Sequence, residues 1–515
     1  MNALPPNPNY SRQSQIDLLA KGQAFDIVVI GGGATGMGIA LDAASRGYRV
    51  ALCERYDFGK GTSSRSTKLV HGGVRYLQQG NVSLVREALH ERGLLLKNAA
   101  EIVYPLPTIV PVYSTWEVPY YWTGLKTYDL LAGRLNIASS GYLSPSATQA
   151  ALPTIKTAGL KGGIRYFDAG FDDTRLLVAL MQTAIDEGAT CVNYMTVERL
   201  RRLEGRASGV VARDTLTDIE YELSAQVVIN ATGPFSDHFR QLDDSSRGAR
   251  IQPSQGAHIV LDRRFLPGDS AMIVPKTSDG RVIFAIPWHG ATLVGTTDTS
   301  LESTPIEPVP MEEEIAFLLS TVGDYLSEAP TRGDIRSMFA GVRPLVSGDE
   351  QNTSKLARDH VIEVSESGLI SVMGGKWTTY RRMAEDAVDR AIEVAGLPTL
   401  ACRTETLELR TQDKQAIGEL SHDDPSLAEP LDPSLPYSTG EALWSIRNEM
   451  AVSVEDVLAR RTRALLLNAA AARRCAPAVA QMLASEFDFD DAWVASQLAE
   501  FNQLVEEHLP AKPDK

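Results

Sequence analysis

The apolar run at 25–30 (FDIVVI) leads directly into a glycine-rich turn at 31–36 (GGGATG), and this junction constrains the fold more than any other segment. Such a short apolar run is typical of a buried parallel strand. The small and apolar residues at 34–45 predict a helix that ends at Gly47, and residues 49–53 predict a second strand. The segment is therefore predicted to form one βαβ unit of a parallel sheet.

The turn fits the G-x-G-x-x-G pattern of a dinucleotide-binding unit, in the required position between a strand and a helix. Gly31 permits the tight turn, Gly33 lets a pyrophosphate approach the backbone, and Gly36 lets the helix pack closely on the strand. The helix N-terminus offers unpaired N–H groups with partial positive charge. Glu54 ends the second strand, where its carboxylate can accept the ribose hydroxyls of an adenosine. NAD and FAD both satisfy this pattern.

A segment rich in hydroxyl groups at 61–68 (GTSSRSTK) follows the acidic residue almost at once, and His71-Gly72-Gly73 comes next. Hydroxyl and N–H groups can hold a pyrophosphate, and the two glycines leave backbone against which a large flat ring can lie. Taken alone, the segment also fits a solvated loop with a glycine turn.

Composition narrows the possible partners of this chain. The formal net charge of -15 argues against binding to a nucleic-acid backbone, which requires a basic face. The four cysteines lie far apart, with no C-x-x-C pair and no histidines at ligand spacing, so we expect reduced thiols and no metal site. The sequence has neither the pattern of a signal peptide nor an apolar run of about 18 residues. A length of 515 residues indicates more than one domain.

Beyond the hydroxyl-rich segment, the pattern of apolar residues predicts strands first and helices later. Residues 227–230 (VVIN) predict another parallel strand, which ends in Ala-Thr-Gly. Between about 250 and 300, short apolar runs alternate with turn residues and indicate a separate sheet that faces the substrate. After about 400, a stretch rich in Pro, Asp and Ser precedes segments at 454–472 and 492–507, which predict long helices.

Six motifs together resemble one known family, the FAD-dependent sn-glycerol-3-phosphate dehydrogenases of the D-amino-acid-oxidase-like flavoprotein superfamily. They are FDIVVIGGGATG, GTSSRSTKLVHGGVRYL (61–77), YYWTGLKTYDLLAG (120–133), VGTTDT (294–299), FAGVRPL (339–345) and GGKWTTYRRMAEDAVD (374–389). The similarity covers about 25–395 well, and the C-terminal part resembles the family's helical cap.

The resemblance implies an α/β fold: a Rossmann-type FAD-binding domain with an inserted β-rich substrate domain and an α-helical C-terminal domain. The predicted ranges are an extension at 1–24, a discontinuous FAD-binding domain at 25–100, 165–250 and 335–398, a substrate-binding domain at 101–164 and 251–334, and a helical domain at 399–515.

The implied reaction oxidises sn-glycerol 3-phosphate to dihydroxyacetone phosphate, with hydride transfer from carbon 2 to flavin N5. Arginine suits the phosphate because its planar fork makes two charge-assisted hydrogen bonds. His258 is the expected general base, since imidazole titrates near neutral pH, although a lysine of lowered pKa competes for that role. By resemblance, the substrate-binding residues are Arg75, Tyr76, His258, Arg343, Arg358 and Lys376, of which His258, Arg343 and Lys376 are assigned to catalysis.

FAD is expected to be bound without a covalent link, although some relatives attach it through a histidine near the position of His71. A helix predicted at 379–394 directs its N-terminus at the pyrimidine end of the flavin, where it would stabilise the anionic reduced form. The residues expected to contact FAD are Gly31, Gly33, Ala34, Thr35, Gly36, Glu54, Thr62, Ser63, Ser64, Ser66, Lys68, Leu69, His71, Gly72, Gly73, Val197, Gly233, Gly375, Lys376 and Thr378.

The resemblance also implies a membrane quinone as electron acceptor, a homodimer, and a cytoplasmic location with peripheral contact at the inner face of the cytoplasmic membrane. Two surfaces are candidates for that contact. One is an aromatic segment with Tyr113, Trp116, Tyr120, Tyr121, Trp122 and Tyr128, and the other is a basic helix with Arg460, Arg461, Arg463, Arg473 and Arg474. The alternative explanations are core packing for the aromatic segment, and a solvated face or pairing between domains for the arginines.

Three other functions stay open on the sequence. The first is an oxidase of the same substrate that reduces oxygen to hydrogen peroxide, and the second is an amino-acid or 2-hydroxy-acid oxidase on the same scaffold. A carboxylate substrate needs fewer cations than this chain offers. The third is an FAD-binding partner protein without catalysis, against which the set of cations and His258 both argue.

Overall fold

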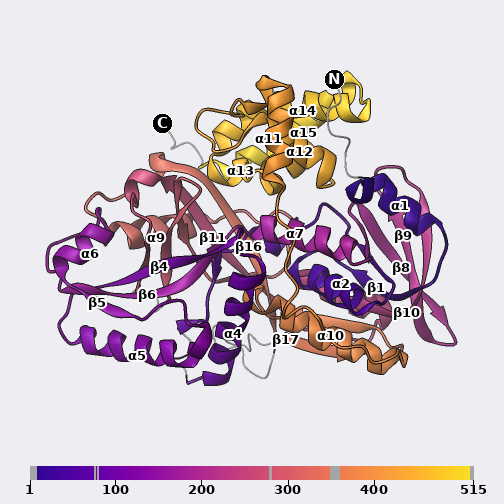
Figure 1. The fold of residues 1–515 in the computed structure, drawn as a ribbon, viewed down its shortest axis with the longest axis horizontal. Coiled ribbons are helices and arrows are strands. Elements are labelled where there is room, and N and C mark those ends of the chain that lie inside the picture. Colours follow the sequence, from indigo (N-terminus) through magenta and orange to yellow (C-terminus); the bar gives the residue numbers. More distant parts are fainter. Residues whose placement is uncertain are drawn as a thin grey trace.

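The computed structural model describes residues 8–74, 77, 80–275, 277, 281–347 and 360–510. Two β-sheets lie side by side, and a layer of C-terminal helices covers the junction between them (Figure 1). None of the helices in these ranges is both long and apolar enough to cross a bilayer.

The first sheet contains the predicted βαβ unit. Its strand order is β17-β18-β10-β1-β2-β7, and β1 pairs in parallel with β10 and β2. Helix α2 (Ala34–Arg46) ends at Gly47, which has a φ of 101°. The helix and both strands predicted from the sequence are therefore confirmed. The strands of this sheet are β1 (Phe25–Ile30), β2 (Val50–Cys53), β7 (Thr190–Val192), β8 (Met195–Leu203), β9 (Arg206–Asp214), β10 (Glu220–Asn230), β17 (His360–Val364) and β18 (Ile370–Gly374).

Helices pack on this sheet through apolar faces. Helix α2 lies against α7 (Asp173–Asp186) and α10 (Tyr380–Ala395). Apolar residues of the N-terminal helix α1 (Arg12–Ala20) and the short α8 (Ser236–Asp243) belong to a second cluster with strands of the same sheet. Gly38 of α2 permits the close contact, because a Cβ there would lie 2.8 Å from the ring of Tyr380. The parallel strands are thus buried, as expected for a doubly wound sheet.

The second sheet has the order β15-β11-β14-β13-β12-β4-β6-β3, with β16 beside β11 and β5 beside β6. Its strands are β3 (Leu69–Val70), β4 (Val103–Val112), β5 (Gly141–Leu143), β6 (Gly162–Phe171), β11 (Ile251–Asp262), β12 (Ala271–Val274), β13 (Ile283–Trp288), β14 (Ala291–Gly295), β15 (Thr299–Ser300) and β16 (Ile335–Val346). Its helices are α4 (Val82–Asn98), α5 (Glu117–Ala132), α6 (Pro145–Ala151) and α9 (Glu312–Gly323).

The sheets do not follow two of the predicted domain borders. Strand β6 spans the border placed at 164/165, and β16 begins at the border placed at 334/335 but pairs with β11 of the second sheet. The reason is long-range pairing: β11 and β16 are about 80 residues apart in sequence, and periodicity within one strand does not reveal its partner.

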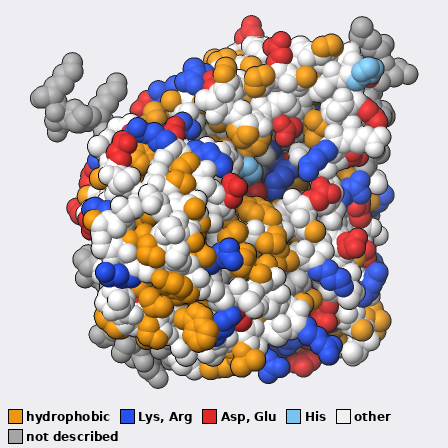
Figure 2. All heavy atoms as spheres, turned by 60° about the vertical axis from the view of Figure 1, so that its left-hand side comes forward, with side chains coloured by type: hydrophobic (Ala, Val, Ile, Leu, Met, Phe, Trp, Pro, Cys, Tyr) orange, Lys and Arg blue, Asp and Glu red, His pale blue; other side chains and the backbone are white. Residues whose placement is uncertain are grey.

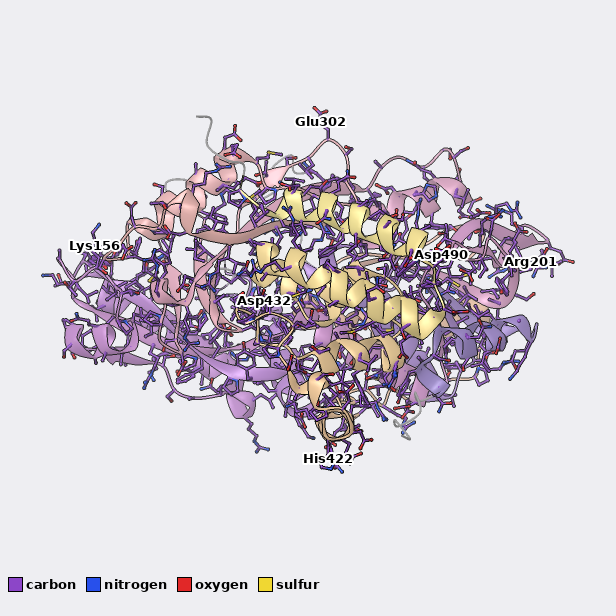
Figure 3. The ribbon with its side chains drawn as sticks, turned by 90° about the horizontal axis from the view of Figure 1, so that it is seen from above. Lys156, Arg201, Glu302, His422, Asp432 and Asp490 are labelled. Atoms are coloured by element: carbon purple, nitrogen blue, oxygen red, sulfur yellow. The ribbon has the colours of Figure 1, made fainter. Side chains whose placement is uncertain are left out.

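The C-terminal helices lie across the junction, with α14 and α15 side by side when seen from above (Figure 3). They are α11 (Lys414–Asp423), α12 (Thr439–Asn448), α13 (Ala464–Leu467), α14 (Ala469–Phe487) and α15 (Asp491–His508). The predicted helix at 492–507 is confirmed. The single helix predicted at 454–472 is wrong, because a π-helical turn (Asp456–Arg461) is followed by a break at Arg463, whose φ is 58°.

Candidate active site

A cavity of about 620 Å³ lies at the carboxyl ends of β1, β2, β10 and β18. Strand ends meet at this edge, so Ile30, Cys53, Ala231 and Gly374 all contribute to its wall. This is the edge at which open α/β sheets bind their ligands, and the volume is that of a cofactor pocket.

The glycine turn leaves no room for side chains at two of its positions. Gly31 has a φ of 105°, and a Cβ there would lie 2.8 Å from the carbonyl oxygen of Ala231. A Cβ at Gly36 would lie 1.9 Å from the carbonyl oxygen of Gly31. Gly36 does not line the cavity itself, and its role is to bring α2 close to the turn.

Glu54 stands at the opposite side of the turn, with its carboxylate fixed by the backbone. It accepts hydrogen bonds from the N–H groups of Gly32 at 2.6 Å and Tyr56 at 2.9 Å. Burial raises the pKa of Glu54, and these two N–H donors partly oppose that effect. The carboxylate lines the cavity in a fixed orientation, as required of an acceptor for ribose hydroxyls.

The hydroxyl-rich loop at 61–67 forms another part of the cavity wall. Ser63 accepts a hydrogen bond from the N–H of Ala34 at 2.9 Å, and its carbonyl accepts another from the indole of Trp377 at 2.8 Å. The loop is thus tied both to the N-terminus of α2 and to the segment that precedes α10. Two basic residues of this region, Lys60 and Arg65, also line the cavity and were not selected from the sequence.

Most of the residues expected to contact FAD border this cavity. Those that line it are Gly31, Gly33, Ala34, Thr35, Glu54, Thr62, Ser63, Ser66, Leu69, His71, Val197, Gly233, Gly375, Lys376 and Thr378. Ser64, Lys68, Gly72 and Gly73 do not line it. The ammonium group of Lys68 is buried and bonded to Asp173 at 2.5 Å and to the Ser64 carbonyl at 2.7 Å, so we correct its assignment from cofactor contact to structural ion pair.

The predicted helix at 379–394 is observed as α10, preceded by the short helical turn Trp377–Thr379. Lys376 and Thr378 line the cavity, so this end of the helix faces it. The position of the helix relative to the flavin stays a prediction.

A second cavity of about 760 Å³ adjoins the first on the side of the second sheet. Thr67, Leu69, His71 and Arg343 line both cavities and mark their border. The guanidinium of Arg343 on β16 donates to the Gln255 carbonyl at 3.3 Å and to the Thr296 hydroxyl at 3.1 Å.

Gly256 makes room for that guanidinium, because a Cβ there would lie 2.3 Å from Nη2 of Arg343. A cation is therefore placed at the border of the two cavities. Arg75, Tyr76 and Arg358 lie outside the described residues.

His258 on β11 lies beside this border, with 2% of its surface exposed. Its Nε2 is 2.9 Å from the hydroxyl oxygen of Thr67, and its ring stacks on Phe339 with centroids 4.8 Å apart. Burial, reinforced by the positive charges of Lys68 and Arg343, lowers the pKa of His258 well below 6.5. The ring is therefore neutral at pH 7, which is the form that accepts a proton.

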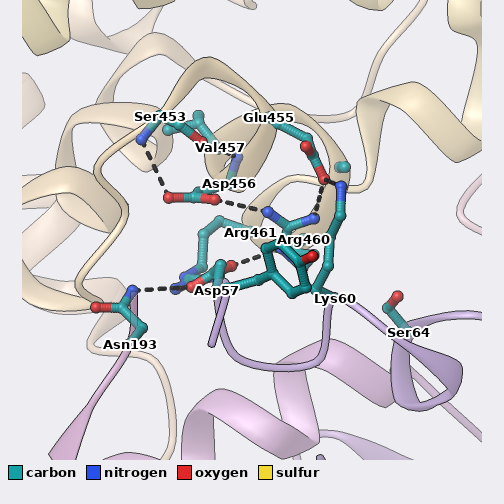
Figure 4. A network of polar contacts seen from close by, with 12 residues as sticks. Asp57, Lys60, Ser64, Asn193, Ser453, Glu455, Asp456, Val457, Arg460 and Arg461 are labelled. Atoms are coloured by element: carbon teal, nitrogen blue, oxygen red, sulfur yellow. Dashed lines mark hydrogen bonds and ion pairs between the residues drawn. The ribbon is translucent and has the colours of Figure 1, made fainter. Parts of the chain in front are cut away.

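The arginines of the predicted basic surface lie inside the molecule instead. Asp57 accepts hydrogen bonds from Arg460 Nε at 2.6 Å and from Arg461 Nη1 at 2.8 Å (Figure 4). Arg463, 1% exposed, bonds to Asp173 at 3.0 Å. The membrane interpretation of these three residues is wrong, and the alternative of pairing between domains is confirmed.

Comparison with known proteins agrees with this geometry. A family model described as FAD dependent oxidoreductase matches residues 26–381, and one described as C-terminal domain of alpha-glycerophosphate oxidase matches residues 410–494. The mitochondrial glycerol-3-phosphate dehydrogenase of Homo sapiens is 40% identical over an alignment 549 residues long. The alignment covers 97% of this chain and 75% of the relative. The chain belongs to the FAD-dependent glycerol-3-phosphate dehydrogenase family.

Two further relatives support the assignment. A probable mitochondrial glycerol-3-phosphate dehydrogenase of Caenorhabditis elegans is 39% identical over 98% of this chain and 76% of its own length. The structure of the glycerol-3-phosphate dehydrogenase from Bacillus halodurans complexed with FAD has a TM-score of 0.78 and 30% identity, and the match covers 98% of this chain and 100% of that one. The enzyme is an FAD-dependent oxidoreductase, as predicted from the sequence.

The residues present fit FAD. The glycine turn and the N-terminus of α2 suit the pyrophosphate, Glu54 suits the ribose of the adenosine, and the cavity continues past the turn to Lys376 and His258. Of the side chains assigned to the substrate, His258, Arg343 and Lys376 line this cavity.

Proposed function

We propose that the enzyme oxidises sn-glycerol 3-phosphate to dihydroxyacetone phosphate and passes the electrons to a membrane quinone. The observation that carries the proposal is the position of Arg343 on the border between the cofactor cavity and the second cavity, within the same wall as His258. A substrate phosphate held by this guanidinium would bring the adjoining carbon chain close to His258, which lines the same cavity.

The residues divide the chemistry as follows. Arg343 and Lys376 supply positive charge for the phosphate and for charge that develops during oxidation. Neutral His258 takes the proton of the hydroxyl at carbon 2, a contribution of typically about 10²–10⁴ in rate. Bound FAD supplies the acceptor for the hydride at N5.

The second cavity favours an apolar electron acceptor. Its wall includes Leu77, Val110, Ile273 and Phe284, and residues Tyr120 and Tyr121 of α5 border it. Asp168, Arg281, Asp298 and Arg343 also line this cavity, and its apolar part suits a quinone ring better than a charged acceptor.

Helix α5 supports a peripheral membrane contact. Trp116 is 60% exposed and Tyr120 51%, while Trp122 and Leu130 are exposed as well. Figure 2, which brings the side of the molecule with α5 and α6 forward, shows hydrophobic side chains gathered there with Lys and Arg side chains among them. Aromatic side chains of this kind favour a membrane interface. Tyr128, in contrast, is buried in the core between α4, α5 and β6.

Anaerobic mixing with sn-glycerol 3-phosphate tests the proposal through the flavin absorbance at about 450 nm. We expect rapid bleaching, followed by faster reoxidation with a soluble quinone analogue than with air. Bleaching followed by stoichiometric hydrogen peroxide in air would favour the oxidase. Reduction by an amino acid or a 2-hydroxy acid instead of the phosphate ester would contradict the proposed substrate.

Release of the flavin tests the expected non-covalent link separately. Precipitation with acid should leave the flavin in the supernatant, and yellow precipitate would contradict the expectation. Flotation with phospholipid vesicles tests the membrane contact: replacing Trp116, Trp122 and Leu130 by serine should abolish flotation while anaerobic bleaching stays unchanged.

A further inference from the structure

Thr67 lies beside His258 and lines both cavities, whereas His258 lines the first cavity and not the second. Oγ1 of Thr67 is 2.9 Å from Nε2 of His258. The two residues are 191 positions apart in sequence, so this contact is created by packing of the hydroxyl-rich loop against β11.

The neighbouring hydroxyl groups of the loop are committed to other partners. Ser66 donates to Asp173 at 2.7 Å, Thr62 to the Val342 carbonyl at 2.5 Å, and Ser64 to the Gly61 carbonyl at 3.3 Å. Thr67 is thus the residue of this loop whose hydroxyl group contacts the imidazole of His258.

Cross-strand neighbours hold the imidazole in this orientation. On one side, Phe339 of β16 lies opposite His258 and stacks at an interplanar angle of 11°. On the other, Gly295 of β14 lies opposite, and a Cβ there would lie 2.1 Å from Cδ2 of the ring. The ring is therefore clamped between two strands with its Nε2 edge towards Thr67.

We propose that Thr67 relays the proton of the substrate hydroxyl to His258. The inference rests on the proposed oxidation of a secondary alcohol. Oγ1 of Thr67 accepts the hydroxyl proton of the substrate while its own proton moves to Nε2, so the threonine is regenerated and the imidazole becomes protonated. The C–H bond at the same carbon breaks, its electron pair leaves with the hydride to the bound flavin, and the carbon–oxygen double bond forms.

The protonation state of the ring suits this direction of transfer. Burial lowers the pKa of His258, and Lys68 and Arg343 are the charged groups that lower it further, so the ring is neutral at pH 7 and one of its nitrogens keeps a lone pair. The relay requires the tautomer in which that nitrogen is Nε2. Both cations also disfavour a lasting imidazolium, which returns its proton to solvent after the hydride has left.

The test compares Thr67→Val and Thr67→Ser in the FAD-loaded enzyme, by anaerobic stopped-flow reduction with sn-glycerol 3-phosphate from about pH 6 to 9. Valine keeps the shape and removes the hydroxyl, so reduction at pH 7 should slow by about 10- to 100-fold, the cost of one lost hydrogen-bonded step. Its rate should also rise with pH as solvent hydroxide takes over. Thr67→Ser should restore the reduction rate of the unmodified enzyme and a rate that does not change with pH over this range.

Thr292→Val is the matched control, because Thr292 is buried on β14 and bonds to the Asp262 carbonyl. The flavin of Thr292→Val should be reduced at the same rate as that of the unmodified enzyme. Independently of turnover, ¹⁵N spectra of histidine-labelled protein should show the Nε2 signal of His258 shifted in Thr67→Val and restored in Thr67→Ser.

Two results would overturn the relay. One is reduction of Thr67→Val at the original rate with a flat pH profile, and the other is equal slowing of the valine and serine variants at every pH, which marks a structural role. If the unmodified enzyme is not reduced by sn-glycerol 3-phosphate, the proposed function itself fails, and the ¹⁵N spectra still test the hydrogen bond.

Discussion

Asp57 is the centre of the contact between the cofactor domain and the C-terminal helices. Its replacement by asparagine should weaken this contact and the retention of the flavin. The carboxylate is fully buried and accepts hydrogen bonds from Arg460, from both terminal nitrogens of Arg461, and from Asn193 (Figure 4). Burial alone raises the pKa of Asp57, but Arg461 and Arg460 outweigh it, and the pKa is lowered overall. The carboxylate is therefore charged in the folded protein.

Asp57→Asn keeps the shape and leaves two buried guanidinium groups short of negative charge. Removing one partner of a buried ion pair costs about 3–5 kcal/mol. With an unfolding entropy of about 2.1 cal/mol/K per residue over 515 residues, this loss lowers the unfolding temperature by about 3–5 °C. Flavin release should follow the same shift, because the neighbours of Asp57 in sequence at 54–56 and 59–63 line the cofactor cavity.

The assay is thermal unfolding of the FAD-loaded protein, followed by flavin fluorescence and circular dichroism. Asp218→Asn is the control, since Asp218 forms an ion pair with Arg213 in which its side chain is 86% exposed, and exposed pairs contribute about 0–1 kcal/mol. An Asp57→Asn variant that unfolds within a degree of the unmodified protein would refute the assignment of this network as a stabilising domain contact.

Three further predictions address the turn, the phosphate site and the C-terminal helix. Gly36→Ala places a Cβ 1.9 Å from the Gly31 carbonyl oxygen and should abolish FAD retention, whereas Gly418→Ala, with open space at its Cβ, should retain full flavin content. Arg343→Lys removes the bidentate fork and should lower kcat/KM for sn-glycerol 3-phosphate by about 10- to 100-fold, and unchanged kinetics would contradict a phosphate contact. Burial lowers the pKa of His508 from 6.5 to about 4, so its stabilising contribution is complete above pH 6.5 and is lost as the pH falls towards 4. The free energy of unfolding, measured with denaturant, should therefore fall between pH 6.5 and pH 5 by about 2 kcal/mol less in His508→Gln than in the unmodified protein. The exposed His422→Gln variant should show the same fall as the unmodified protein.

The cofactor half of the site was largely predictable from the sequence. Gly31, Gly33 and Glu54 act through backbone geometry and fixed spacing, which a short segment of sequence contains in full. Lys68 was misassigned because it belongs to the same motif, although its ammonium group turns to Asp173. Thr67 lies in that motif too, and no local pattern distinguishes it from the hydroxyl groups beside it.

The C-terminal region shows the same limit. Apolar periodicity predicted one helix across 454–472, but the buried bonds of Arg460 and Arg461 to Asp57 and of Arg463 to Asp173 hold this segment in a π-helical turn and a left-handed residue. Electrostatic contact with a distant segment outweighed local helix propensity here.

The sequence by itself determined the βαβ unit, the dinucleotide site and the helix that faces it, because each depends on residues close together in the chain. The tertiary structure alone decided which strands join the second sheet, which arginines are buried, and which hydroxyl group meets His258. Those outcomes depend on pairs of residues separated by tens to hundreds of positions, and the packing that joins them leaves no periodic mark in the sequence.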